Sequence, residues 1–166
     1  MAEPAVVLIG APGSGKSRIG KRIAKRLDLP FVDTDQRIVA QHGVIADIFT
    51  THGEPHFRAL ERAAVERALH EHAVVSLGGG AVLDPLTQAD LAGLNVVQLV
   101  VTEEYVAPRL NNDKRPLIGG DIEKWKAIVE ARKPLYDSLS THIVDTSTRP
   151  ATVLADEIAH WVQEHS

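Results

Sequence analysis

The sequence contains no cysteine. This absence excludes a disulfide framework and a thiolate metal or redox site, and it is compatible with a reducing compartment. No apolar run approaches the roughly 20 residues that a membrane-spanning helix needs. The N-terminus also lacks the basic segment followed by an apolar segment that is typical of a secretory signal. We therefore expect a cytoplasmic protein with no membrane partner.

An excess of basic residues is missing too. The 18 lysines and arginines are outnumbered by 22 aspartates and glutamates, which gives a formal net charge of −4. Such a balance provides no overall attraction to nucleic acid, so we expect a small-molecule partner and only local basic sites. A length of 166 residues with 44% hydrophobic content is enough for one core. We expect a single domain over residues 1–166 and, because no helix has a surplus apolar face, a monomer.

One contiguous segment carries a specific chemical signal. Residues 10–17, Gly-Ala-Pro-Gly-Ser-Gly-Lys-Ser, match the glycine-x4-glycine-lysine-serine pattern of a phosphate-binding loop. A β-branched apolar run at 5–9 precedes the loop, and a helical pattern follows it at 18–27. The pattern thus lies between a strand and a helix, as phosphate binding requires. The alternative is a glycine-rich turn that only connects the two elements.

The loop predicts a site for a nucleoside triphosphate. Backbone N–H groups at the start of a helix favour phosphate oxygens, because they carry partial positive charge. Lys16 should reach the β- and γ-phosphates, and the hydroxyl of Ser17 should ligate Mg²⁺. We expect ATP or GTP with Mg²⁺, bound by Gly10, Gly13, Ser14, Gly15, Lys16 and Ser17.

Apolar strands alternate with helical patterns along the chain. Strands are expected at about 5–9, 31–33, 73–77, 96–101 and 143–145, and helices at about 18–27, 36–41, 54–72, 84–92, 121–139 and 150–165, with a helical turn near 46–49. A further helix should begin at Thr102, and Pro108 should end or kink it early. The alternation predicts an α/β fold in which helices flank a single doubly wound, five-stranded parallel sheet. The helix at 54–72 should bury Phe57, Leu60, Ala64, Ala68 and Leu69.

Three groups of residues beyond the loop are candidates for a binding site. Asp33 and Asp35 end the second strand, at the sheet edge where ligands bind, although Asp35 could instead cap the next helix. Arg58 and Glu61 are neighbours on one helix face, where the alternative is an ordinary surface ion pair. Glycines 78–80 leave the third strand, which indicates either close approach by a ligand or a flexible loop.

Three other features bear on function. The stretch at 109–120 is polar and basic with glycines at its far end, which suits a mobile lid over phosphates at about 111–120, or else a solvated loop. No acid ends the third strand, so the second metal position falls to Asp33. The eight histidines form no convincing set of metal ligands.

These residues, taken together, resemble one family. The resemblance rests on residues 10–17, Asp33-Thr34-Asp35, Gly53-Glu54 with Phe57-Arg58 and Glu61, Gly78-Gly79-Gly80, Arg115-Pro116-Leu117, and Arg132 with Pro134-Leu135-Tyr136. In identity, order and spacing they are similar to those of shikimate kinases. The resemblance implies a P-loop kinase similar to nucleoside monophosphate kinases, with a core at 1–34, 73–110 and 121–166, a substrate-binding segment at about 35–62, and the lid.

The resemblance also implies an activity and an acceptor site. Shikimate kinases transfer the γ-phosphoryl of MgATP to the 3-hydroxyl of shikimate, on the way to chorismate and the aromatic amino acids. Arg58 and Arg132 match the arginines that bind the shikimate carboxylate, and Glu61 matches the acid that orients the site near Arg58. Gly79 and Gly80 match positions whose backbone N–H groups meet the substrate. Asp35 matches the carboxylate that orients the substrate hydroxyls and accepts a proton.

On the donor side the resemblance assigns further roles. Asp33 would hold Mg²⁺ through water, with Ser17 as a direct ligand, while Lys16 and Arg115 would neutralise the transferring phosphoryl group. Arg109 and Arg149 match positions near the adenine. The nearest competing enzyme is another small-metabolite kinase such as a gluconate kinase. A competing class is a nucleotide-dependent binding module without an acceptor, which would not need Asp35 or the second set of arginines.

Overall fold

The structure is a computed structural model that describes residues 2–110 and 122–166, except for the side chains of residues 109 and 110. The lid expected at 111–120 and Arg115 lie outside the described residues. The elements in chain order are β1 (Val6–Gly10), α1 (Lys16–Leu27), β2 (Phe31–Asp33), α2 (Thr34–His42), α3 (Ile45–His52), α4 (Glu54–Ala68), β3 (Val74–Ser76), η1 (Ala81–Leu83), α5 (Pro85–Leu91), β4 (Val96–Val100), α6 (Glu103–Leu110), α7 (Ile122–Leu139), β5 (His142–Asp145) and α8 (Ala151–Glu164).

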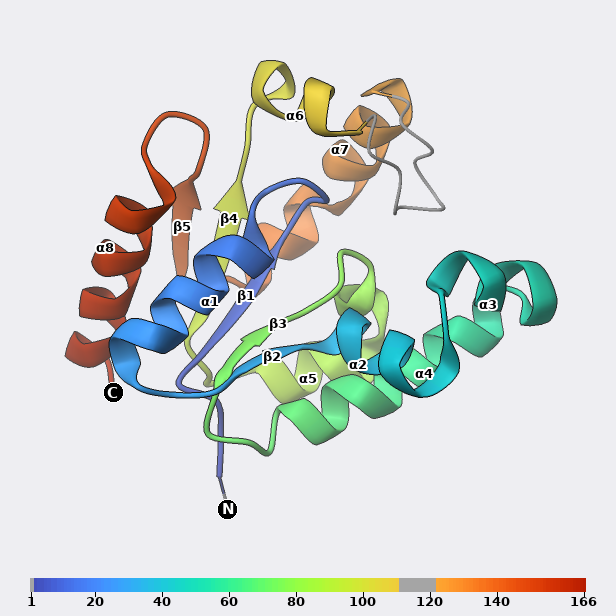
Figure 1. Ribbon diagram of the computed structural model, residues 1–166, viewed down its shortest axis with the longest axis horizontal. Coiled ribbons are helices and arrows are strands. Elements are labelled where there is room, and N and C mark those ends of the chain that lie inside the picture. Colours follow the sequence, from blue (N-terminus) through green and yellow to red (C-terminus); the bar gives the residue numbers. More distant parts are fainter. Residues whose placement is uncertain (1, 111–121) are drawn as a thin grey trace.

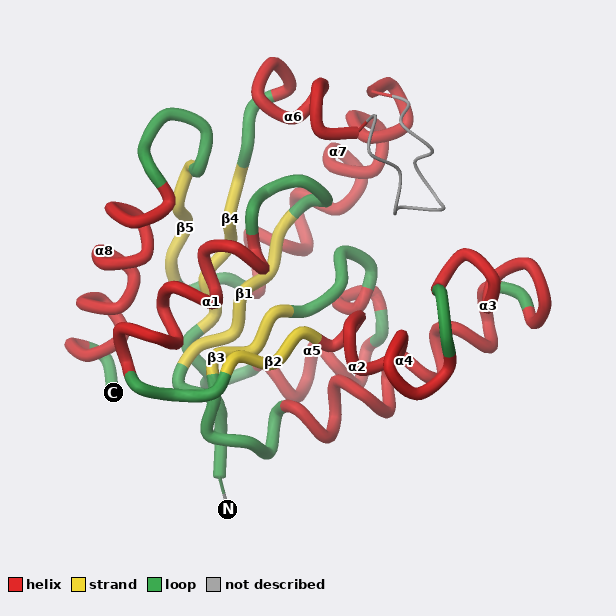
Figure 2. The backbone as a smooth tube through the Cα atoms, in the orientation of Figure 1, coloured by secondary structure: helices red, strands yellow, loops and turns green. Residues whose placement is uncertain are grey.

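The strands form one parallel sheet in the order β2-β3-β1-β4-β5 (Figures 1 and 2). β1 lies at its centre, where Val7 pairs with Val75 of β3 and with Val96 of β4. All five residues of β1 are buried, as their continuous apolar run predicts for a strand covered on both faces. The predicted five-stranded, doubly wound fold is confirmed.

Alternate residues of β1 serve two hydrophobic cores, one on each face of the sheet. Val6 and Leu8 belong to a cluster that α1 and α8 cover, whereas Val7 and Ile9 belong to a cluster on the opposite face. The second cluster includes Val65 of α4, Leu91 of α5 and Tyr136 of α7. The period of two along a strand produces this division.

α2, α3 and the start of α4 extend beyond one edge of the sheet, and α3 lies farthest from it (Figure 1). They have a small core of their own, formed by Ile38, Ile48 and Phe57. The segment from 35 to 62 therefore packs largely on itself.

Some element boundaries differ from the predictions. α4 ends at Ala68 rather than near His72, because the chain must turn to enter β3 at Val74, and Arg37 of α2 holds Glu71 of this turn through two hydrogen bonds. α3 is a helix of eight residues, longer than the turn expected near 46–49.

Pro108 was expected to end or kink its helix early, and the alternative in which it ends the helix is wrong. α6 continues to Leu110 with Pro108 inside it. Proline removes the one backbone bond that its N–H would donate to the Glu104 carbonyl, and the remaining bonds maintain this short helix.

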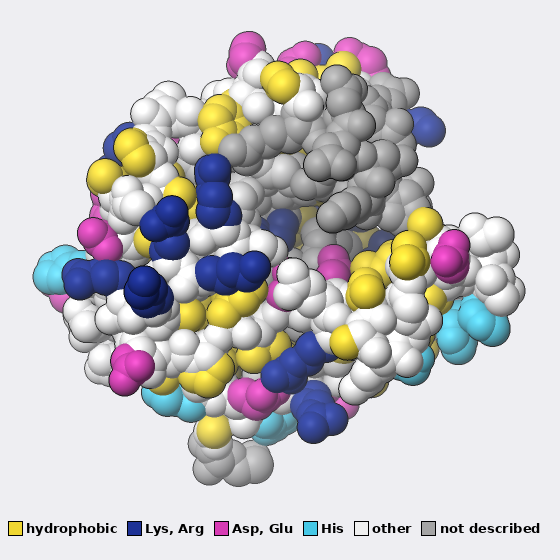
Figure 3. Space-filling view, viewed as in Figure 1, with side chains coloured by type: hydrophobic (Ala, Val, Ile, Leu, Met, Phe, Trp, Pro, Cys, Tyr) yellow, Lys and Arg dark blue, Asp and Glu magenta, His cyan; other side chains and the backbone are white. Residues whose placement is uncertain are grey.

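Basic side chains gather over α1 (Figure 3). Arg18, Lys21, Arg22 and Lys25 are exposed, and α1 directly follows the phosphate-binding loop. The molecule thus has a local basic surface despite its net charge of −4. No helix in the described part of the chain has the length and apolarity to cross a membrane.

Candidate active site

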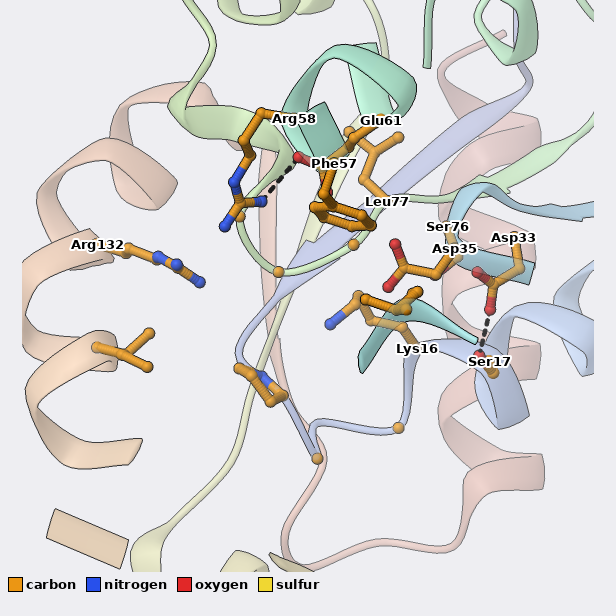
Figure 4. Close-up of a pocket in the computed structure, with 18 of the residues that line it drawn as sticks. Lys16, Ser17, Asp33, Asp35, Phe57, Arg58, Glu61, Ser76, Leu77 and Arg132 are labelled. Atoms are coloured by element: carbon orange, nitrogen blue, oxygen red, sulfur yellow. Dashed lines mark hydrogen bonds and ion pairs between the residues drawn. The ribbon is translucent and has the colours of Figure 1, made fainter. Parts of the chain in front are cut away.

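A cavity of about 490 Å³ opens where β1, β2 and β3 end. Its lining comes from the phosphate-binding loop, from α2, α3 and α4, from the glycines after β3, and from α7 (Figure 4). Predicted donor residues such as Lys16 and predicted acceptor residues such as Arg58 therefore share one cavity, although they are far apart in sequence.

The phosphate-binding loop is held by hydrogen bonds to its carbonyl groups. Trp125 donates from its indole nitrogen to the Pro12 carbonyl at 2.8 Å, and Thr146 donates from its hydroxyl to the Ser14 carbonyl at 2.8 Å. Gly15 has a φ of 90°, a left-handed conformation that favours glycine, directly before α1 begins. The loop is thus fixed from behind by α7 and by the segment after β5.

Polar groups of this loop are placed to meet phosphate. The Lys16 ammonium donates to the carbonyl oxygens of Gly10 and Ala11, at 2.8 and 3.2 Å. The Ser14 hydroxyl is buried and has no hydrogen-bond partner among the described residues. A buried polar atom without a partner is costly, so a ligand oxygen that completes its bonding would be stabilising.

Asp33 connects β2 to the loop. One carboxylate oxygen accepts a hydrogen bond from the Ser17 hydroxyl at 2.8 Å, and the other accepts from the Gln36 N–H at 3.2 Å. Asp33 is therefore the N-cap of α2, which settles the question whether Asp35 has this role.

Asp35 lies in the first turn of α2, and its carboxylate lines the cavity (Figure 4). Its Oδ1 atom is buried without a hydrogen-bond partner among the described residues. Burial, with smaller contributions from the Glu61 and Asp33 carboxylates, raises the pKa of Asp35 from 3.8 to about 6, although Lys16 and Arg58 oppose the rise. Asp35 is thus a carboxylate that the protein itself leaves unsatisfied.

Arg58 and Glu61 form an ion pair that differs from an ordinary surface pair. Arg58 Nη1 lies 2.8 Å from Glu61 Oε1, and Glu61 is only 4% exposed. Glu54, one turn earlier, also contacts the Arg58 guanidinium at 3.1 Å. Burial raises the pKa of Glu61, whereas Arg58 opposes the rise. The two acids hold the guanidinium at the cavity wall.

The glycines after β3 leave room for these charged side chains. A Cβ atom on Gly80 would lie 2.5 Å from Arg58 Nη1, and one on Gly78 would lie 2.5 Å from Asp35 Oδ1. On Gly79 it would lie 3.4 Å from Arg132 Nη1, so this α7 arginine reaches the same glycines from across the cavity (Figure 4). The protein's own charged side chains thus approach residues 78–80 closely, and close approach by a ligand stays a prediction.

The structure adds residues that sequence reasoning did not assign to the site. Ile45, Phe49 and Phe57 form an apolar wall, and the two phenylalanine rings lie 5.0 Å apart. The Arg58 guanidinium lies 5.4 Å from the centre of the Phe57 ring. The chain has only three phenylalanines, so the presence of two of them within the segment at 35–62 was the available signal.

Not every candidate is brought to the cavity. Arg149 is exposed and pairs with Glu157 of α8 at 2.6 Å, and it does not line the cavity. Arg115 and the side chain of Arg109 are outside the described residues. Their roles near the nucleotide stay predictions.

The described residues contain no group of three or more His, Cys, Asp or Glu side chains that could hold a metal ion. Mg²⁺ does not need such a group, since it keeps several waters and is commonly bound by one or two protein oxygens together with substrate phosphates. The Ser17 hydroxyl and the Asp33 carboxylate, in contact beside the phosphate-binding loop, fit that requirement.

Comparisons with known proteins point to one family. The family model described as shikimate kinase matches residues 12–163. The chain is 44% identical over 162 residues to a shikimate kinase from Thermobifida fusca, covering 95% of this chain and 94% of that protein. It is 48% identical over 151 residues to a shikimate kinase from Mycobacterium avium, covering 88% of this chain and 86% of that protein.

Among solved structures, a shikimate kinase from Acinetobacter baumannii, determined in complex with shikimate, superposes with a TM-score of 0.91. That comparison covers all of this chain and 96% of the other, at 27% identity.

Proposed function

The chain belongs to the shikimate kinase family and is an ATP-dependent kinase, and we propose that it uses the described cavity to phosphorylate the 3-hydroxyl of shikimate. The products would be shikimate 3-phosphate and ADP. The observation that carries the proposal is the meeting, beside a phosphate-binding loop, of two guanidinium groups with a buried carboxylate that has an unpartnered oxygen.

The acceptor half suits a small ring with one carboxylate and several hydroxyls. Arg58 and Arg132 would bind the carboxylate, because a guanidinium can donate two parallel hydrogen bonds to a planar anion. Glu61 would keep Arg58 in place. The apolar wall would contact the ring, and Gly79 and Gly80 would offer backbone N–H groups where any side chain would obstruct the substrate.

Asp35 would accept a hydrogen bond from the reacting hydroxyl and, as transfer proceeds, its proton. A pKa near 6 lets the carboxylate be ionised at neutral pH and still be a competent base. Because phosphoryl transfer passes through a loose transition state, orientation of the hydroxyl should matter more than base strength.

The donor half would bind the ATP phosphates. Lys16 would exchange its two carbonyl partners for phosphate oxygens and stabilise the charge that develops during transfer. Ser17 and Asp33 would hold Mg²⁺, which supplies charge neutralisation on the phosphates when bound. The exposed bases of α1 would favour the approach of the anionic nucleotide.

The described side chains assigned to the two halves can meet in one cavity within a single copy of the chain. We therefore propose that a monomer is sufficient for activity.

Measuring ADP release with MgATP in the presence of shikimate, gluconate or nucleoside monophosphates tests the function. We expect release that depends on shikimate and a product that is shikimate 3-phosphate by mass. Turnover that does not depend on shikimate, or turnover with gluconate and none with shikimate, would contradict the proposal.

A further inference from the structure

One buried hydroxyl contacts the glycines of the acceptor half from outside the cavity. Tyr136 of α7 is 3% exposed, and its hydroxyl donates to the Gly79 carbonyl at 2.5 Å. The Gly10 carbonyl lies farther from the same hydroxyl, at 3.4 Å. A hydroxyl has one hydrogen to donate, so the shorter contact, to Gly79, is the main bond.

Core packing holds this hydroxyl in place. The Tyr136 ring packs in the core cluster that contains Ile9, Val75 and Leu77. Burial raises the pKa of Tyr136, so the hydroxyl keeps its proton and remains a donor. Tyr136 also follows Arg132 by one helical turn, which places both side chains on one face of α7.

The hydrogen bond from Tyr136 fixes the direction of the Gly80 N–H as well as that of the Gly79 carbonyl, because both groups belong to the same peptide unit. The described residues contain no cis peptide, and in a trans peptide the carbonyl and the N–H point in opposite directions. A donor that holds the Gly79 carbonyl on the α7 side therefore turns the Gly80 N–H away from α7. The glycines on both sides of this peptide have no side chain that could fix its plane.

The Gly80 N–H is also available for a ligand. Among the described residues no group accepts a hydrogen bond from it. Both glycines line the cavity beside Arg58 and Arg132. Hydrogen bonding at the carbonyl end of a peptide also polarises it and makes its N–H a better donor.

We propose that Tyr136 is a positioning residue that orients the Gly79–Gly80 peptide. In this orientation the Gly80 N–H donates a hydrogen bond to the same bound shikimate molecule that the Arg132 guanidinium contacts. The inference rests on the proposed function, since it requires that shikimate binds in this cavity. Tyr136 itself would not touch the substrate.

Tyr136→Phe in the full chain tests the inference, because it removes the hydroxyl and keeps the ring that fills the core. We expect the shikimate Kd, measured by calorimetry, to rise about tenfold, which corresponds to about 1.4 kcal/mol. KM for shikimate should rise in parallel, whereas the Kd for ATP should change less than about twofold, or about 0.4 kcal/mol.

A second readout reports on the peptide itself. With glycine labelled by ¹³C at the carbonyl and ¹⁵N at the amide, coupled signals arise only from the pairs 78–79, 79–80 and 119–120. The Gly80 amide signal of the ligand-free protein should shift in Tyr136→Phe. This readout does not depend on activity and separates a change of orientation from a general loss of stability.

Thr141→Val is the matched control. The Thr141 hydroxyl hydrogen-bonds to the backbone of Val96, the first residue of β4. The glycines follow the last residue of β3, at the other edge of the parallel sheet, so the substitution removes hydrogen bonds away from them. We expect lower stability with an unchanged shikimate Kd. A folded Tyr136→Phe protein with the wild-type shikimate Kd and Gly80 signal would overturn the role of Tyr136 and leave the proposed function intact. A wild-type protein that neither binds nor phosphorylates shikimate would instead overturn the proposed function.

Discussion

The two halves of the cavity are built in different ways. The donor half is mainly a contiguous loop, residues 10–17, with Asp33 beside it, and the loop's Lys16 ammonium already donates to two backbone carbonyls. The acceptor half combines side chains of α2, α4 and α7, and it buries Asp35 with a carboxylate oxygen that has no partner among the described residues.

The two halves differ in how much each destabilises the ligand-free protein. In the donor half a phosphate must compete with two carbonyl groups for Lys16, although it could also complete the bonding of the buried Ser14 hydroxyl. An acceptor hydroxyl that reaches Asp35 relieves an existing cost, because an unpartnered buried polar atom destabilises the free protein by about 1–3 kcal/mol. The acceptor half is therefore the more strained of the two, because its unpartnered atom belongs to a carboxylate, whereas that of the donor half belongs to the neutral Ser14 hydroxyl.

The largest expected effect is the loss of phosphoryl transfer in the variant Asp35→Asn. The amide keeps the size of the side chain but cannot take the proton, and we expect kcat to fall by about 10²–10⁴-fold. The Kd for ATP should change less than about threefold, which is below 1 kcal/mol. Steady-state kinetics and calorimetry check both values, and activity near that of the wild type would remove Asp35 from the proposed mechanism.

Arg58→Ala and Arg132→Ala should each weaken acceptor binding. A hydrogen bond to a charged group contributes about 1.5–3 kcal/mol, so the shikimate Kd should rise about 10- to 150-fold while ATP binding stays nearly constant. The two variants should differ in stability, since Arg58→Ala also leaves buried Glu61 without its ion-pair partner. Calorimetry and thermal unfolding measure the two effects.

Two controls separate binding from folding in this experiment. Adding Glu61→Gln to Arg58→Ala removes the unpaired charge, and it should restore stability without restoring affinity. Arg37→Ala breaks an arginine–glutamate pair outside the cavity lining, and it should leave the shikimate Kd unchanged. Equal losses of ATP and shikimate affinity in Arg132→Ala would contradict the division into two halves.

The same contrast explains what the sequence could predict. The donor half was predictable, because the loop is contiguous and its pattern has a local geometric cause. The five parallel strands were predictable too, since their apolar runs alternate with helical patterns. The strand ends indicated that Asp35 and the glycines share one edge of the sheet. The position of Arg132 relative to the glycines depends on packing between segments far apart in the chain, and only the family resemblance indicated it.

The burial of α4 shows why residue type alone misleads. The predicted stripe contained Leu60 and Ala64, which are only half-buried, whereas the fully buried line includes Glu61 and Val65. An apolar pattern cannot include a buried acid whose place in the core depends on an ion pair with Arg58. Glu61, a residue of the candidate site, is therefore buried at a position next to Leu60, the one that the hydrophobic spacing predicted to be buried.

Tyr136 illustrates a different limit. Its residue type is visible in the sequence, but its partner is a backbone carbonyl, which every residue has. No pattern of side chains reports such a contact.

The smallest expected effect is on stability, and it distinguishes the two halves without any substrate. A carboxyl group whose folded-state pKa is raised binds its proton more tightly in the folded protein than in the unfolded one. The cost of ionised Asp35 is therefore fully present above about pH 6, and it is relieved as the pH falls from about 6 to 3.8. One pKa unit corresponds to about 1.4 kcal/mol, so the cost above pH 6 is at most about 3 kcal/mol.

Asp35→Asn should therefore be more stable than the wild type at pH 8 by about 1–3 kcal/mol, and the gain should disappear near pH 4. Urea unfolding of the ligand-free proteins at pH 8, 6 and 4 measures the trend. Asp47→Asn, which changes the same charge at an exposed position of α3, should show no such gain. In the donor half, Lys16→Met should be destabilising, because it removes two hydrogen bonds rather than an unsatisfied charge. If Asp35→Asn were less stable than the wild type at pH 8, or if Asp35→Asn and Lys16→Met gained stability alike, the acceptor half would not be the more strained half of the site.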